Sequence, residues 1–450
     1  AFNPTVSSSS SVSTDSTSAD TVLETRGKWG GLILLGNAPT NMPTTTPIEG
    51  ITGYTYGGNI PTESSGSLQY VRVWHGGAVV GANNEINGIT FGGVGSGTIV
   101  DHCEVAFNLD DGFEFFGGTV NVKYLSVLFA GDDAFDTDDG YVGKGQFLFA
   151  MLGAVGNHGC EMDSRYGSTP RSHPAFYGMT LVGAGALSTR PGNAMMRLRE
   201  GTGGKFGNMI LANVATHPGI RIDTCSSGGS TAPSIVSVLP AASVSLDTYL
   251  FFSSNNIIQS PTAGFQILSP CTGTAPAFVN TNPLISGGTF TETSTTPIDP
   301  RACGPAAFSN VDPVPTGDSF FDTTTYKGAF GSVNWLDGWS FFNLPNRPGF
   351  VSSTFTCPSA ADRDDSVALC GTLSADKMLY SGALYVLTCQ MFVPSGITLG
   401  IQAGVTIYAS PVAAGGGGAP ALIIEKGGFL LAEGSATMPI TFTAFNPTVS

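Results

Sequence analysis

The 450-residue chain has few charged residues and many glycines, and this composition favours one long β-rich body. Only 11% of its residues are charged, against about 25% in a typical soluble domain, which excludes helical bundles and coiled coils with their highly charged surfaces. The formal net charge of −15 would repel a phosphate backbone, so a nucleic-acid partner is excluded as well.

The heptapeptide AFNPTVS occupies residues 1–7 and occurs again at residues 444–450. Three origins are open: a window cut from near-identical tandem modules, a polymer whose subunit boundary is arbitrary, or an engineered permutation or duplicated tag. If the two copies mark a junction, residues 357–443 of one copy pack on residues 29–36 of another, and the chain assembles head to tail. The residues expected at this junction are Ala1, Phe2, Asn3, Ala444, Phe445 and Asn446.

Short strands recur along the middle of the chain at nearly constant spacing. The segment VDHCEVAF at 100–107 is followed 22 positions later by VKYLSVLF at 122–129, and two consecutive Asp residues recur at the same interval. A repeat of about 20 to 25 residues built from strands and turns is typical of a parallel β-solenoid, because a single coil cannot bury its apolar face alone. A β-sandwich or a propeller is the alternative.

The strand pattern resumes near the end of the chain after a break. Residues 341–365 lack alternation and contain several prolines, as a linker does. Later runs, such as VTIYAS and ALIIEK, return to the short apolar segments of strands. We therefore divide the chain into a main β-helix body with a C-terminal cap (1–348), a linker (349–370) and the first coils of the β-helix, of the same or the next module (371–450).

Several motifs together carry a family resemblance. They are RGKWGGLILLGNAPTN (26–41), SGSLQYVRVWHGG (65–77), NNEINGITFGGVGSGTIVDHCEV (83–105), DDGFEFFGGTVNVKYL (110–125) and YKGAFGSVNWLDGWSFF (326–342). These motifs closely resemble a large family of secreted or lipid-anchored bacterial surface proteins without a settled activity. The resemblance implies an all-β, right-handed parallel β-helix of the pectin-lyase-like type. In those relatives the counterpart of 371–443 comes first, so the order of segments here is permuted or cut from a tandem or polymeric array.

The acidic stretch DDAFDTDDG at 132–140 lies one repeat after Asp110 and Asp111. Equivalent positions of successive coils stack about 4.8 Å apart, so these carboxylates are expected to form a ladder on one face. One explanation is that the side chains cap turns by bonding their own backbone. Another is a site for Ca²⁺, which prefers oxygen ligands. The residues expected to hold this ion are Asp133, Asp136 and Asp138.

A catalytic interpretation is also open. Polygalacturonase-type hydrolases on this fold carry Asn-x-Asp, Asp-Asp, Gly-His-Gly and Arg-x-Lys on successive coils, and this chain offers NLD at 108–110, GDD at 131–133, GNHG at 156–159 and RID at 221–223. The His motif has an inserted Asn, and Asp223 replaces the expected Lys, so we predict no glycosidase activity. If the chain were an enzyme, its catalytic residues would be Asp110, Asp132, Asp133 and His158.

Eight widely spaced cysteines without a Cys-x-x-Cys pair favour disulfides, and therefore an extracellular location. The alternative is that several are small buried core residues. Cys357, Cys370 and Cys389 are expected to staple the linker to the first coils. All eight are candidates for disulfides: Cys103, Cys160, Cys225, Cys271, Cys303, Cys357, Cys370 and Cys389.

These features favour an extracellular structural protein, a β-helical module that assembles head to tail with copies of itself into a surface filament, hair or surface layer. Surface glycans are a second candidate partner. No cofactor is expected, Ca²⁺ being the one candidate, and no apolar run approaches the roughly 18 to 20 residues of a membrane span. Two alternatives remain: a polysaccharide-acting hydrolase or lyase, and a calcium-dependent glycan-binding adhesin.

Overall fold

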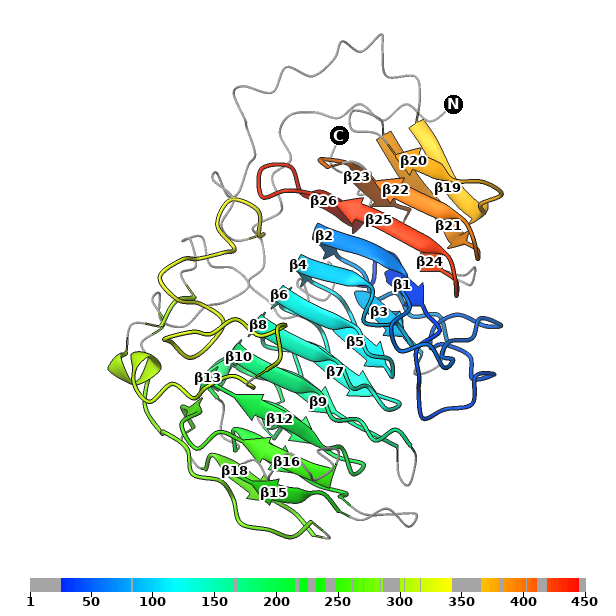
Figure 1. The fold of residues 1–450 in the computed structure, drawn as a ribbon. Helices are drawn as coiled ribbons and strands as arrows, with labels where there is room; N and C mark the ends of the chain where they lie inside the picture. Colours follow the sequence, from blue (N-terminus) through cyan, green and yellow to red (C-terminus); the bar gives the residue numbers. More distant parts are fainter. Residues whose placement is uncertain are drawn as a thin grey trace.

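The computed structural model describes residues 26–81, 84–165, 169–190, 192–214, 218–225, 232–238, 248–260, 263–269, 271–283, 285, 300–302, 304–315, 317–341, 366–379, 384–401, 403–410 and 419–444. These segments form a stack of β-strands (Figure 1), with no α-helix among them. None of their helical turns is long and apolar enough to cross a membrane.

The strands are short and join into one parallel network. Their bounds are β1 (Leu32–Leu35), β2 (Gly66–Trp74), β3 (Ile89–Gly92), β4 (Ile99–Ala106), β5 (Phe113–Phe116), β6 (Asn121–Leu128), β7 (Phe135–Asp138), β8 (Lys144–Met151), β9 (Cys160–Met162), β10 (Ala175–Val182), β11 (Met196–Leu198), β12 (Gly204–Gly207), β13 (Ile210–Ala212), β14 (Ile220–Ile222), β15 (Ser234–Val236), β16 (Tyr249–Phe252), β17 (Ile257–Ile258), β18 (Phe265–Ile267), β19 (Ser366–Thr372), β20 (Lys377–Leu379), β21 (Leu384–Val393), β22 (Thr398–Ile401), β23 (Thr406–Ala409), β24 (Leu422–Ile424), β25 (Phe429–Glu433) and β26 (Ile440–Ala444).

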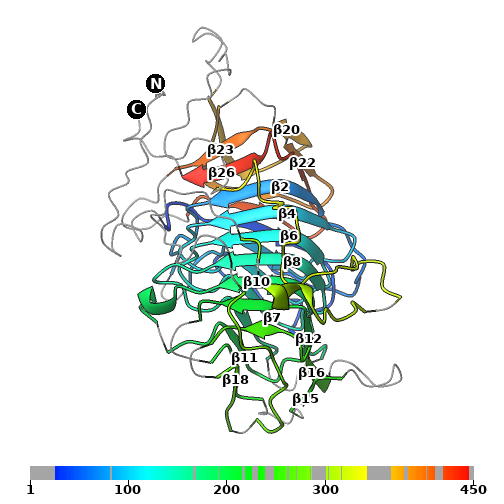
Figure 2. The same cartoon turned by 90° about the vertical axis from the view of Figure 1, so that its left-hand side faces the viewer.

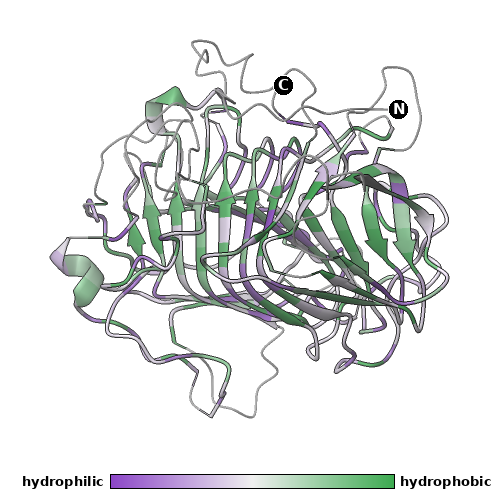
Figure 3. Ribbon diagram, turned by 90° about the horizontal axis from the view of Figure 1, so that it is seen from above, coloured by the Kyte–Doolittle hydropathy of each residue, from purple (hydrophilic) through white to green (hydrophobic). Residues whose placement is uncertain are grey.

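Equivalent residues of successive coils lie directly beside one another, as the 22-residue repeat predicts. Val100 of β4 pairs with Val122 of β6. On another face, Phe113 of β5 pairs with Phe135 of β7, and their rings stack with centroids 5.8 Å apart. Inward-facing apolar side chains of this kind form one long core, and Figure 3 shows the hydrophobic colouring along the strands. The predicted all-β, right-handed parallel β-helix is therefore confirmed.

The long strands β2, β4, β6 and β8 bend at one residue with positive φ, which carries the chain from one face of the helix to the next. These residues are aromatic rather than glycine: Tyr70 (φ 52°), His102 (49°), Tyr124 (55°) and Phe147 (61°). A left-handed conformation costs a non-glycine residue about 1–2 kcal/mol. Their rings stack in one outer column, with successive centroids 4.4, 4.3 and 4.8 Å apart, and each such pair contributes about 0.5–1.5 kcal/mol.

The segment 326–341, here called the strap, runs along this aromatic column (yellow in Figures 1 and 2). Trp335 lies 5.5 Å from the ring of Tyr124, and Trp339 lies 5.5 Å from the ring of Tyr70. The backbone amide of Gly328 donates to the carbonyl of Asn208 at 2.7 Å. The C-terminal cap of residues 1–348 was expected to cover the end of the helix. This prediction is wrong in position, because Trp335 and Trp339 cover the side of the helix.

The C-terminal coils pack on the beginning of the same chain. Strand β24 pairs in parallel with β1, with Leu422 beside Leu32, and β25 and β26 pair with β2. The expectation that residues 357–443 pack on residues 29–36 of another copy is therefore wrong for the described part of this segment, since β24 pairs with β1 within one chain. Along the helix axis β24 lies between β21 and β1, so the last described coils of the sequence precede the first ones in the stack.

The predicted boundaries meet the structure only in part. Strand β19 begins at Ser366 and pairs with β21, so the last residues of the expected linker, 366–370, belong to the solenoid. Of the residues expected at a head-to-tail junction, Ala444 ends β26 and pairs with Ala409. The others lie outside the described residues: Ala1, Phe2, Asn3, Phe445 and Asn446.

Two disulfides occur in the described segments, Cys225–Cys271 and Cys370–Cys389. The second joins β19 to β21 in the first coils, as expected for those two cysteines. The prediction of disulfides is wrong for Cys103 and Cys160, which are buried free thiols. Both point into the apolar core of the helix, where they pack as small hydrophobic side chains. Cys303 and Cys357 lie outside the described residues.

Candidate functional site

Polar side chains form a continuous column on the outer side of one sheet, which contains β3, β5, β7, β9, β11, β14 and β18. The strands are parallel and in register, and their inward positions are apolar, so the residue after each inward position faces outward. The column changes from acidic to basic along the helix axis. Its members in spatial order are Thr90, Glu114, Asp136, Glu161, Arg197, Arg221 and Gln266.

A second polar column lies in the turns that lead into these strands. The backbone amide of Asp133 donates to Oδ1 of Asp111 at 2.8 Å. In the next coil, the backbone amide of His158 donates to Oδ1 of Asp133 at 2.6 Å, and Nδ1 of His158 lies 2.9 Å from the same oxygen. Each carboxylate therefore fixes the turn of the coil that follows. Asp133 and His158 are both only 2% exposed.

Arginines neutralise the carboxylates in the later coils. Arg199 lies 2.6 Å from Oε2 of Glu161 and 2.6 Å from Oδ2 of Asp163. Arg197 lies 3.2 Å from Oε1 of Glu161 and 3.1 Å from Oδ2 of Asp223. Arg197 is the register partner of Glu161, and Arg199 follows two residues later, so this part of the column is a compensated ion network.

The earlier coils contain carboxylates without such compensation. Oxygens of Asp111, Glu114 and Asp136 lie within 4.8 Å of one another. Burial raises the pKa of all three well above the ordinary range, and neighbouring carboxylates raise it further. Nδ2 of Asn87 contacts Oε2 of Glu114, and Oδ1 of Asn87 and Oδ1 of Asp136 are buried without a hydrogen-bond partner.

A loop from residues 41–58 covers part of the acidic column. The hydroxyl of Tyr56 donates to Oδ2 of Asp139, and Nδ2 of Asn41 donates to the carbonyl of Ser164 at 2.8 Å. Ile48 and Ile51 of this loop pack in an apolar cluster that holds it in place. The carboxylates are thereby shielded from large ligands, although a small ion needs far less space.

The structure brings together the residues considered for catalysis, but in a different geometry from that of an inverting hydrolase. Oxygens of Asp110, Asp111 and Asp132 lie within 4.8 Å of one another, whereas inverting pairs stand about 6.5–9.5 Å apart. Asp132 is paired with Arg190 at 2.6 Å. Burial and the neighbouring charges of Glu49 and Asp132 raise the pKa of Asp110 to about 8.

The expected calcium residues do not share one site. Asp133 belongs to the group with His158, and Asp136 belongs to the group with Asp111 and Glu114. Oδ1 of Asp138 accepts a hydrogen bond from the amide of Asp139 at 2.6 Å, which is the turn-capping role. Among the described residues, no group of ligand atoms within 4.8 Å contains all three of Asp133, Asp136 and Asp138.

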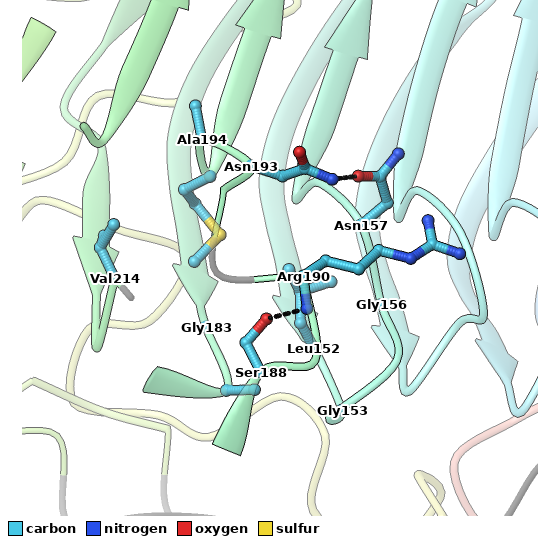
Figure 4. A pocket seen from close by; sticks show the side chains of 12 residues that line it. Leu152, Gly153, Gly156, Asn157, Gly183, Ser188, Arg190, Asn193, Ala194 and Val214 are labelled. Carbon is cyan, nitrogen blue, oxygen red and sulfur yellow. Dashed lines mark hydrogen bonds between the residues drawn. The ribbon is translucent and has the colours of Figure 1, made fainter. Parts of the chain in front are cut away.

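A shallow pocket of about 310 Å³, open solvent included, lies beside the turn column (Figure 4). Asn193 donates from Nδ2 to Oδ1 of Asn157 across its upper side, and Leu152 and Val214 contribute apolar walls. The guanidinium of Arg190 is directed to Asp132.

Sequence reasoning missed the arginines and the asparagine of this site. The segment MRLR at 196–199 alternates apolar and basic residues, which is the signal of a strand with two outward arginines, Arg197 and Arg199. Asn87 carries no comparable signal. It joins the site because the turn before β3 lies beside the turn that holds Asp111, whose carbonyl accepts from the amide of Gly88.

Comparisons with known proteins agree with this architecture. The family described as "Pectate-lyase like beta helix domain" matches residues 12–256 and 371–449. No curated protein and no solved structure matches the chain. The two matched segments contain most of the solenoid strands, with β17 and β18 just beyond residue 256, and the match confirms the fold implied by the sequence resemblance. Because they make up more than two thirds of the chain, the protein belongs to the family of pectate-lyase-like β-helix domains.

Proposed function

We propose that the chain is a structural module of an extracellular or cell-surface assembly and not a polysaccharide-acting enzyme. The observation that carries this proposal is that two of the four residues a hydrolase would need, Asp133 and His158, are buried, and that a third is held in an ion pair. Asp133 and His158 bond each other, and Asp132 pairs with Arg190. A general acid or a nucleophile must reach the glycosidic oxygen or the anomeric carbon, and side chains that are 2% exposed cannot reach a polymer.

The construction of the solenoid supports a mechanical role. Its coils share one apolar core, the strap joins distant coils along the side, and the C-terminal coils close on the N-terminal ones. The disulfides Cys225–Cys271 and Cys370–Cys389 support an oxidising, extracellular compartment.

Head-to-tail assembly through the two ends of the solenoid is the form of this role that we propose. Among the described strands, β19 pairs only with β21 and β20 only with β22 at one end. At the other end, β15 pairs only with β16 and β18 only with β14. Open edges of this kind recruit further strands unless they are blocked. The partner would be a second copy, docked at these ends.

Electron microscopy of the full chain, before and after concentration, tests this assembly. Filaments with a constant axial repeat are expected. Met378 in the end strand β20 is 47% exposed, and a charge there should discourage pairing, so Met378→Glu is expected to shorten or abolish the filaments. Val333→Glu is the matched control, because Val333 is 70% exposed on the strap.

Incubation with polygalacturonate and related glycans tests the other half of the proposal. Neither reducing ends nor unsaturated products should accumulate. Monomeric particles at all concentrations would overturn the assembly. Turnover that is lost in Asp132→Asn would overturn the structural role and favour the enzymatic alternative.

A further inference from the structure

The uncompensated carboxylates between the early coils assign a metal site. We propose that one Ca²⁺ ion binds between the coils of β3, β5 and β7, held by carboxylate oxygens of Asp111, Glu114 and Asp136 and by Oδ1 of Asn87. The site differs from the one expected at Asp133, Asp136 and Asp138, and it does not depend on whether the module forms filaments.

The first argument is position. Glu114 and Asp136 are register partners on adjacent parallel strands, and Asp111 lies in the turn immediately before Glu114. Oxygens of the three carboxylates lie within 4.8 Å of one another. A cation between oxygens that close can contact all of them at the 2.3–2.6 Å typical of Ca²⁺ after small side-chain rotations.

The second argument is independent of the carboxylate cluster. Oδ1 of Asn87 is buried without a partner in a residue that is only 1% exposed. The same amide group contacts Glu114 through Nδ2, so its oxygen lies at the edge of the cluster. A buried amide oxygen without a donor costs free energy unless something binds it, and Ca²⁺ accepts amide oxygens as ligands. Oδ1 of Asp136 is likewise buried and without a partner.

The third argument compares two halves of one column. Where Glu161 follows Asp136 in the stack, Arg197 and Arg199 supply the opposite charge. In the described residues no arginine or lysine pairs with Asp111, Glu114 or Asp136 in this way. Like charges in a shielded site destabilise each other unless a cation or protons neutralise them. Burial also disfavours the charged form of Asp111, Glu114 and Asp136, and it raises the pKa of each carboxyl group.

The chemistry of the ligands selects the metal. All four proposed ligands are oxygens, and neither a cysteine nor a histidine belongs to the group. Zinc prefers nitrogen and sulfur, and Mg²⁺ requires near-ideal octahedral geometry with several waters, whereas Ca²⁺ tolerates irregular protein cages. Glu49 of the covering loop lies beside Glu114 and Asn87, and it offers a further oxygen.

Calcium titration of the chelator-treated full chain by isothermal calorimetry tests the site. One Ca²⁺ per chain is expected, with weaker binding of Mg²⁺. Asp136→Asn and Asn87→Ala should weaken binding at least tenfold. Asp163→Asn is the matched control, since it makes the same change in a carboxylate that Arg199 already neutralises, and it should bind Ca²⁺ as the parent does.

Thermal unfolding provides a second readout, because an ion that binds only the folded chain raises its Tm. At a Ca²⁺ concentration one hundred times the Kd, the Tm of the parent should rise by about 3 °C. In chelator, Asp136→Asn should unfold at or above the Tm of the parent, because it removes one repelling charge. The same Ca²⁺ concentration should raise the Tm of this variant by no more than about half as much.

Three results would overturn the proposal. The first is no calcium binding by the folded parent. The second is parent-like binding by Asp136→Asn. The third is binding lost in Glu161→Gln but kept in Asp136→Asn, which would move the ion to the group of Asp133, His158 and Glu161.

Discussion

Oδ1 of Asp133 accepts a hydrogen bond from the backbone amide of His158 at 2.6 Å, and the same oxygen lies 2.9 Å from Nδ1 of the His158 ring. One carboxylate oxygen thus holds the backbone and the side chain of the same residue in the following coil. The pair has the composition of a catalytic dyad, but its effect in this fold is to fix the approach of one coil to the next.

Asp133→Ala should therefore destabilise the protein. Two buried donors lose their acceptor, which costs about 1–3 kcal/mol each, and the relief of repulsion with neighbouring carboxylates offsets only part of that cost. We expect a net loss of about 2–3 kcal/mol, measured by urea unfolding. Asp132→Ala is the control, because Asp132 and Arg190 are each about 40% exposed and such a pair contributes less than about 1 kcal/mol. Equal losses in the two variants would contradict the assigned role.

The acidic column should make the calcium-depleted protein less stable as the pH rises. Burial raises the pKa of Asp110 to about 8 and that of Asp138 to about 7, from an ordinary value of 3.8. Between about pH 4 and pH 8 the folded chain therefore binds more protons than the unfolded chain, and the free energy of unfolding falls with increasing pH. Measurement of the Tm across this range in chelator should show a steady decrease. A Tm that rises from pH 4 to pH 8 would contradict the raised pKa values.

The cysteines should separate into two chemical classes. Alkylation in denaturant without reductant is expected to label Cys103 and Cys160, and alkylation of the native protein should label neither, because both are buried. Peptide mapping should recover the linked pairs Cys225–Cys271 and Cys370–Cys389. Labelling of any of these four cysteines without reduction would contradict the assigned pairing.

An engineered disulfide can test whether the C-terminal coils dock within one chain. Gln69 of β2 and Glu433 of β25 are register partners at the surface, and adjacent strands are about 4.8 Å apart, which suits a disulfide. The double variant Gln69→Cys, Glu433→Cys should form this bond within the monomer, as seen on a non-reducing gel. Covalent dimers or ladders instead of monomers would place the C-terminal coils on another copy.

The sequence was sufficient for the coil architecture, because local repetition encodes it. Val100 and Val122 stand one repeat apart, and stacking follows directly from that spacing. The acidic ladder was predictable for the same reason. The partners of the ladder were not predictable: Arg199 reaches Glu161 only after coils of unequal length bring the two strands side by side.

The packing of the strap against the side of the helix could not be predicted from the sequence either. From the sequence, Trp339 is expected to cap the end of the helix, because it follows the last regular strand of the main body. Its position on the side of the helix depends on a column of rings at Tyr70, His102 and Tyr124, each at a bend with positive φ. No residue pattern identifies such a bend, since glycine is the usual choice there.

Closure of β25 on β2 also constrains the order of events during folding. Gln69 and Glu433, which hydrogen-bond across this junction, are separated by 364 positions. Contacts of such long sequence separation form slowly, because the entropy of closing the intervening chain is lost before the contact is gained. Docking of β24, β25 and β26 on β1 and β2 is therefore expected late in folding, after the neighbouring coils of the main body have stacked on one another.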